Sequence, residues 1–151
     1  SLEPTRVIPL PSILEKIGVT NCLALTTNNF HFTRSDSFVS GKGEDGRNVS
    51  ILEFDDKTGF AARFNSYRFS VNDNVSTFVK TAYTALCQGV DEATAIECTL
   101  TQESAMVINN IRALHCRNVI KDNRRVLVRI FGLSKFSTPI VVSEDPLVLR
   151  G

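Results

Sequence analysis

The sequence predicts an α+β fold: a β-α-β-α-β-β core, preceded by a β-rich extension that contains a short helix. Between residues 67 and 131 the hydrophobic pattern changes from alternation to helical spacing and back again, twice. Apolar residues make up 42% of the chain and the mean hydropathy is near zero, which is typical of a soluble domain with a core. A length of 151 residues suits one domain with a sizeable appendage. We place the extension at residues 1–65 and the core domain at residues 66–151.

The extension is predicted to be mostly antiparallel. Prolines within residues 3–11 favour an extended chain. Ser12 and Glu15 have the spacing of a capping box, which predicts a short helix to about Ile17, ended by Gly18. Residues 22–26 and 30–33 are predicted strands, and residues 49–54 and 60–64 a hairpin. The glycine-containing loop at residues 40–48 lacks the ending and the following helix of a phosphate loop, so no nucleotide site is expected there.

The first half of the core is a predicted strand and helix. Residues 67–71 alternate between apolar and polar side chains, as in a half-buried strand. Asn72, Asp73 and Asn74 offer side-chain oxygens to the first amides of a helix. Apolar residues at spacings of three and four follow from Val75, and Gly89 is expected to end this helix.

The second half of the core repeats this order. A strand is predicted at residues 94–100. Thr99 and Gln102 have capping-box spacing, and the apolar stripe at residues 107–114 predicts a second helix. A third strand at residues 125–131 is expected to bury Val126, Val128 and Ile130. Residues 139–143 form the predicted return strand, and residues 147–149 are able to pair only at an edge or with a partner.

The run from Asn74 to Leu100, followed by a helix ending near IRALHCRN, resembles the Alba proteins in element order, helix length and the Gln88-Gly89-Val90 turn. Alba proteins are small nucleic-acid-binding dimers related to ribonuclease P subunits. The resemblance implies an Alba-like core, RNA or DNA binding, and a homodimer or a heterodimer with an Alba-like partner. Asp73 and Glu103 stand where Alba proteins carry basic residues, and they would repel phosphate. A protein-interaction or scaffold module that has lost nucleic-acid binding is therefore the second hypothesis.

Positive charge is concentrated after the second predicted helix. The net charge is only +1, so the whole chain has no strong basic field, yet residues 101–151 hold eight Lys or Arg against four acids. We predict that these basic residues contact phosphates and that an aromatic residue stacks on bases. The predicted nucleic-acid surface comprises Arg112, Arg117, Lys121, Arg124, Arg125, Arg129, Lys135 and Phe136. Leu127 and Phe131 are predicted to form an apolar interface patch on the same strand; a solvated strand face is the simpler alternative.

Catalytic signatures are missing from the sequence pattern. The chain has two histidines, His31 and His115, and shows neither a paired-carboxylate arrangement nor a Ser-His-Asp signature. Cys98, His115 and Cys116 do not make up the set of about four ligands that closes a metal site. We therefore expect no enzyme, no metal or other cofactor and no small-molecule substrate. The predicted function is that of a non-catalytic RNA- or DNA-binding subunit that dimerises within a ribonucleoprotein assembly.

The expected location is intracellular, either cytoplasmic or nuclear. The four cysteines show no CxxC spacing, which favours reduced thiols. No apolar run is long enough to cross a bilayer, so no membrane partner is expected. Organelle targeting by a removed presequence is left open.

Overall fold

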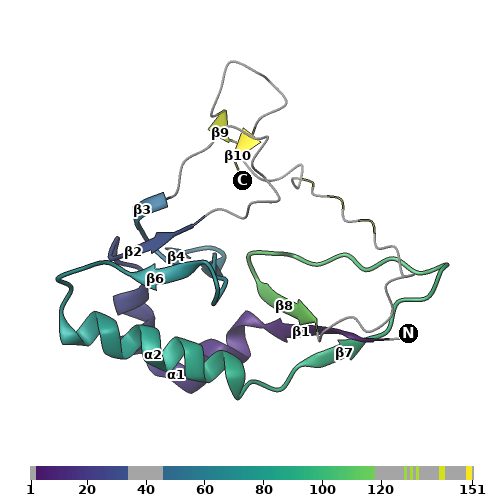
Figure 1. Cartoon of the computed structure of the whole chain (residues 1–151), viewed down its shortest axis with the longest axis horizontal. Coiled ribbons are helices and arrows are strands. Elements are labelled where there is room, and N and C mark those ends of the chain that lie inside the picture. The colour runs from purple at the N-terminus through teal and green to yellow at the C-terminus, as the bar shows by residue number, and fades with distance from the viewer. Residues whose placement is uncertain are drawn as a thin grey trace. The chain divides into compact units, whose positions relative to one another are not determined.

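The computed structural model describes residues 3–33, 46–117, 128, 130, 132, 140–141 and 149–150. Two helices and ten short strands lie within this part of the chain (Figure 1). The chain divides into two compact units, Leu2–Ile120 and Lys121–Gly151. In the second unit β9 (Ile140–Val141) pairs antiparallel with β10 (Leu149–Arg150). Neither of the described helices combines the length and the apolar character that a membrane span requires.

Strand β1 (Thr5–Pro9) is the centre of the first sheet. It pairs antiparallel with β7 (Ile96–Cys98) on one side and with β8 (Ala113–Arg117) on the other. The sheet order is therefore β7-β1-β8, which brings the start of the first unit beside strands about ninety and one hundred and ten positions further along the chain. The extended chain predicted for residues 3–11 is confirmed for residues 5–9, which form β1.

A second sheet and a hairpin complete the β structure of this unit. Strand β2 (Phe30–Phe32) lies between β3 (Gly46–Val49) and β6 (Phe69–Val71), antiparallel to both. Strands β4 (Leu52–Asp55) and β5 (Gly59–Ala62) form the predicted hairpin. In its turn, Asp55 Oδ1 accepts hydrogen bonds from the backbone N–H groups of Lys57 and Thr58 at 3.0 and 2.8 Å.

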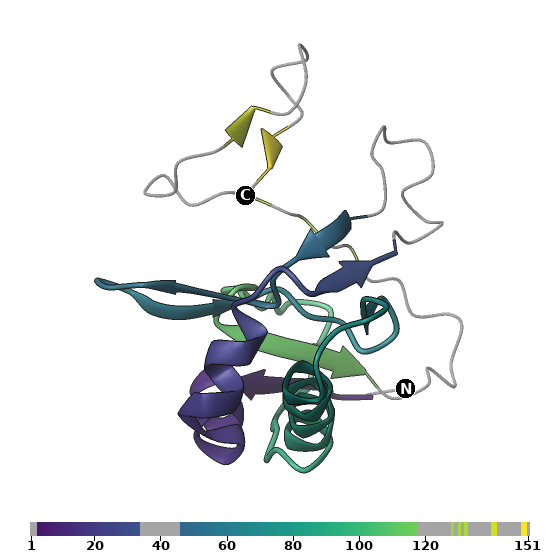
Figure 2. The same ribbon diagram turned by 90° about the vertical axis from the view of Figure 1, so that its left-hand side faces the viewer.

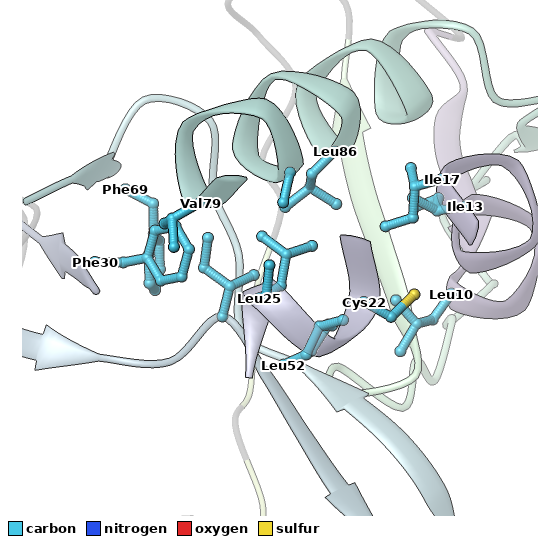
Figure 3. Close-up of a cluster of buried hydrophobic side chains, with 14 of the residues drawn as sticks. Leu10, Ile13, Ile17, Cys22, Leu25, Phe30, Leu52, Phe69, Val79 and Leu86 are labelled. Atoms are coloured by element: carbon cyan, nitrogen blue, oxygen red, sulfur yellow. The ribbon is translucent and has the colours of Figure 1, made fainter. Parts of the chain in front are cut away.

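The two helices pack side by side and carry most of the core (Figure 2). Helix α1 (Leu10–Leu25) is interrupted at Gly18, whose φ of 77° and ψ of 159° divide it into two helical segments. Gly18 thus ends the first segment as predicted. The strand predicted at residues 22–26 is wrong, because α1 continues to Leu25 and buries Cys22 and Leu25 against the core. Figure 3 shows this core, with side chains from α1 and α2 converging on Phe30, Leu52 and Phe69.

Helix α2 (Thr77–Asp91) differs from its prediction at both ends. Its N-cap is Ser76, whose hydroxyl accepts from the Val79 N–H at 3.4 Å, rather than the residues at 72–74. Gly89 lies inside the helix instead of ending it. A Cβ at Gly89 would stand 2.9 Å from Ile17 Cγ2, so the absent side chain lets α2 approach α1 closely.

The predicted second core helix does not form. Residues 101–112 contain turns but neither helix nor strand, and β8 begins at Ala113. The capping interpretation of Thr99 and Gln102 is therefore wrong, and the β-α-β-α-β-β core is wrong with it. Val128 and Ile130, which were expected inside, are 77% and 88% exposed, and the rest of the strand predicted at residues 125–131 lies outside the described residues.

Tyr83 joins α2 to the second sheet. Its ring stacks on Phe30, meets Phe64 edge-on, and its hydroxyl donates to the Phe69 carbonyl at 2.6 Å. Burial, followed by the nearby Cys87 thiol, raises the pKa of Tyr83 to about 12. The unfolded chain has the ordinary tyrosine pKa of about 10. The folded state therefore holds this proton more tightly than the unfolded state does.

We expect part of the folding stability to be lost as the pH rises from about 10 towards 12. The contribution of Tyr83 is fully present below its unfolded pKa and disappears as the pH passes its folded pKa. Urea unfolding of the wild type and of Tyr83→Phe at several pH values in this range measures the contribution of Tyr83 to the free energy of unfolding, because the variant lacks the ionising group. Tyr67→Phe is the control, since Tyr67 is 92% exposed. Identical pH profiles for Tyr83→Phe and the wild type would contradict the assignment.

Candidate functional site on the β7-β1-β8 sheet

His115 occupies the middle of β8, directly opposite Val7 of β1. Val7 is in turn opposite Ile96 of β7. Because successive side chains of a strand point to opposite faces, these three residues share one face of the sheet. Ile8 and Leu114 occupy the other face, where they contribute to the core. Half-buried His115 therefore lies on the face directed away from the helices.

The same face carries further polar positions beside the histidine. Thr5 lies opposite Cys98 on one side and opposite Arg117 on the other. Thr5 is only 2% exposed, so this face is not uniformly open to solvent. The sheet thus brings positions for an imidazole, a thiol and a hydroxyl into two neighbouring rows.

The start of β8 is fixed by contacts with two other elements, β5 and α1. The Ile111 carbonyl accepts from the Ala62 N–H at 2.9 Å, and the Arg112 carbonyl accepts from the Leu10 N–H at 2.9 Å. The Arg112 guanidinium donates through Nη1 to the Phe60 carbonyl. Helix α1 has no side-chain cap, so the bond from Leu10 also satisfies one of its free amides. These contacts hold the strand that presents His115.

The other histidine belongs to a different sheet. His31 lies in β2, with Nδ1 at 3.2 Å from Asn72 Oδ1 and Nε2 at 2.7 Å from Ser70 Oγ. Both ring nitrogens are thus engaged by neighbouring side chains. The candidate on the first sheet is His115, because of its place on the sheet face shared with Val7 and Ile96.

The described residues do not assemble a complete metal site. No three side chains of His, Cys, Asp or Glu among them lie close enough to hold an ion. Cys98 shares the face of His115, but Cys116 is opposite Arg6 and so belongs to the other face. The set Cys98, His115 and Cys116 considered in the sequence is therefore split between the two faces, and His115 remains a single candidate ligand.

Two members of the predicted basic surface fall within the described part of the chain. Arg112 precedes β8 and binds the Phe60 carbonyl, and Arg117 ends β8. The remaining members, together with the predicted interface pair, lie outside the described residues: Lys121, Arg124, Arg125, Arg129, Lys135, Phe136, Leu127 and Phe131. Their grouping on one surface stays a prediction.

Sequence reasoning missed the strand that carries His115. The apolar spacing at residues 107–114 predicts a helix instead. Two signals pointed the other way. Asn109 and Asn110 are turn-forming residues, and the Asn109 carbonyl indeed accepts from the Arg112 and Ala113 N–H groups at 3.0 and 3.1 Å. The run from Ala113 to Arg117 that follows has the length of a strand.

Comparison with known proteins shows which solved structures share this fold. No protein-family model matches the sequence, and no curated protein matches it significantly. Among solved structures, non-heme iron oxygenase OrfP in complex with Fe, succinate and (3S)-hydroxy-L-Arg has a TM-score of 0.65 at 24% identity, over 82% of this chain and 36% of that chain. The chain shares its fold with non-heme iron oxygenases.

Two further oxygenase structures show the same similarity of fold. OrfP with Fe and α-ketoglutaric acid has a TM-score of 0.65 at 23% identity, covering 82% of this chain and 37% of that one. Asparagine oxygenase with Fe(II), 2S,3S-3-hydroxyasparagine and succinate has a TM-score of 0.65 at 17% identity, with the same coverage of 82% and 37%. The chain therefore spans a little over a third of the length of the oxygenases that it matches.

These structures correct the expectations drawn from the Alba resemblance. The chain does not have an Alba-like core, and the scaffold hypothesis that assumed this core loses its support. A non-catalytic ribonucleoprotein subunit with RNA or DNA and an Alba-like protein as partners is contradicted, because the proteins that share the fold are oxygenases. The expectations of no enzyme and no small-molecule substrate are contradicted as well, since these oxygenases are seen with hydroxylated arginine or L-canavanine.

The anchoring of β8 predicts the effect of removing the Arg112 guanidinium. Arg112→Met keeps the aliphatic stem but leaves the Phe60 carbonyl without this donor, which should lower the free energy of unfolding by about 1–3 kcal/mol. The His115 ring signals should shift in NMR spectra, because the strand that carries the histidine is anchored beside Arg112. Lys57→Ala removes an exposed cation from the nearby hairpin turn and should change stability by no more than about 0.5 kcal/mol. Equal effects of the two substitutions would refute the anchoring role.

Proposed function

We propose that the chain forms part of a non-heme iron oxygenase that uses 2-oxoglutarate and acts on an amino acid or a similar small molecule. The observation that carries the proposal is His115, held half-buried on the outer face of the β7-β1-β8 sheet in a chain that shares the oxygenase fold. Two kinds of oxygenase with this fold are seen with a hydroxylated amino acid and succinate, which supports this class of substrate and cosubstrate.

His115 would supply one ligand of the iron. Non-heme iron oxygenases bind Fe(II) with two histidines and one carboxylate, which leaves positions open for cosubstrate and oxygen. The sequence contains one other histidine, His31, and its ring is already bound by Asn72 and Ser70. The described residues therefore supply one of the three iron ligands, His115. The other two ligands are not found among them.

Arg117 would anchor the cosubstrate. 2-Oxoglutarate is a dicarboxylate, and a guanidinium binds a carboxylate through two parallel hydrogen bonds. Arg117 follows His115 by two positions in the sequence, and its backbone pairs with Thr5 of β1. This role makes use of a residue that the sequence had suggested for phosphate contact.

The assignment of His115 is tested by titrating the protein with Mn²⁺, a paramagnetic substitute for Fe(II), while the imidazole signals are followed by NMR. The His115 signals should broaden first, since its face is the candidate ligand site. The His31 signals serve as an internal control, because both nitrogens of that ring are engaged. His115→Ala should abolish the selective broadening and His31→Gln should leave it in place.

The same titration examines Arg117. Adding 2-oxoglutarate should strengthen the Mn²⁺ effect at His115 in the wild type, and Arg117→Ala should weaken this response about ten- to a hundredfold, the value of a charge-assisted hydrogen bond. Broadening of both histidines alike, or of neither, would reject His115 as a ligand and remove the support for the proposed function.

A further inference from the structure

A second polar cluster lies on the β3-β2-β6 sheet. His31 of β2 is directly opposite Ser70 of β6, and Ser70 Oγ stands 2.7 Å from His31 Nε2. The neighbouring residues Phe30 and Phe32 alternate to the other face, where they stack on Tyr83 and Phe69. The His31–Ser70 pair is therefore on the face away from the aromatic core, and both residues are half-buried.

Asn72 fixes the protonation of the His31 ring. Its Nδ2 donates to Asn48 Oδ1 at 2.8 Å, so its Oδ1 is the atom that stands 3.2 Å from His31 Nδ1. An amide oxygen only accepts, which means that Nδ1 carries the proton. In the neutral ring Nε2 is then an acceptor, and the Ser70 hydroxyl donates its proton to it. The serine thus faces a base that is oriented by a third group.

Asn48 holds the far end of this chain of hydrogen bonds. It has a φ of 54°, in the left-handed region that asparagine tolerates better than most residues. The register of β2 and β3 shifts between Phe30 and Phe32, next to this position. Irregularities of this kind redirect a side chain within a sheet. The network therefore runs across all three strands, from Asn48 through Asn72 and His31 to Ser70.

We propose that Ser70 is a nucleophile that accepts the acyl group of small activated carboxylic esters. A hydroxyl, an adjacent base and a group that orients the base are the parts that activate a serine or a cysteine in acyl transfer. The cluster is on a different sheet from His115, so this activity does not depend on iron.

The reaction takes place in two steps. Ser70 Oγ forms a bond to the acyl carbon as its proton passes to His31 Nε2. The ester C–O bond breaks, and the departing alcohol takes that proton. Water then attacks the acyl-serine and gives its proton to His31 Nε2, which returns it to Ser70 Oγ as the carboxylic acid leaves. Asn72 is a positioning residue that keeps the ring in the required tautomer.

The test is to incubate the 151-residue protein with p-nitrophenyl acetate, follow nitrophenol release, and locate acetyl groups by peptide mass spectrometry. In the wild type, we expect the peptide that contains Ser70 to carry an acetyl group. The same peptide of Ser70→Ala should carry none. His31→Gln removes the base and should slow acetylation of Ser70 about 10²- to 10⁴-fold. Ser50→Ala, which alters a half-buried serine outside the network, should leave the rate unchanged.

Asn72 is examined by a conservative pair of variants. Asn72→Asp retains an oxygen that accepts from Nδ1 and should keep most of the acetylation rate, whereas Asn72→Leu should lose it at an equal melting temperature. The proposal is overturned if the wild type is acetylated only on lysines, or if His31→Gln reacts at Ser70 as fast as the wild type. Either result would leave the Ser70–His31 contact as a structural hydrogen bond between strands.

Discussion

Pairing of β1 with both β7 and β8 is the constraint on which the first unit depends. It joins Val7 to Ile96 and to His115 in a single row. Helix α1 follows β1 directly, and its first amide, on Leu10, is bound by the carbonyl of Arg112 just before β8. Strand β1 is therefore the central strand of a sheet, and the helix that follows it directly packs on α2. Without this pairing, residues 113–117 would lack the strand that holds them extended.

The two larger sheets of this unit divide their faces in the same way. Apolar residues such as Ile8 and Phe30 face the helices, and the outer faces carry polar groups. As a result the two histidines of the chain have separate environments. His115 lies opposite Val7 of β1, while the ring of His31 is fixed by Ser70 and Asn72. Each sheet therefore offers a different chemistry on its outer face.

Local patterns predicted the elements that local forces determine. The hairpin at residues 49–64, the strand ending at Val71 and the helix that became α2 follow from alternation, turn residues and helical spacing. Residues 107–114 were mispredicted, because Val107, Ile111 and Leu114 have helical spacing, whereas Ile111 is bound by Ala62 and Leu114 is paired with the distant β1. The face on which His115 lies could not be predicted before that pairing was known, and the Alba resemblance rested on the same misplaced helix.

The most direct test of this account is the contact between Val7 and His115. In NMR spectra of the isotope-labelled protein, backbone protons of Val7 and His115 should show a cross-strand nuclear Overhauser effect, as should those of Ile8 and Leu114. This result would establish β8 and the face on which His115 lies. Sequential helical contacts between residues three apart across 107–114, without contacts to β1, would contradict it, since they would restore a helix and separate His115 from the sheet.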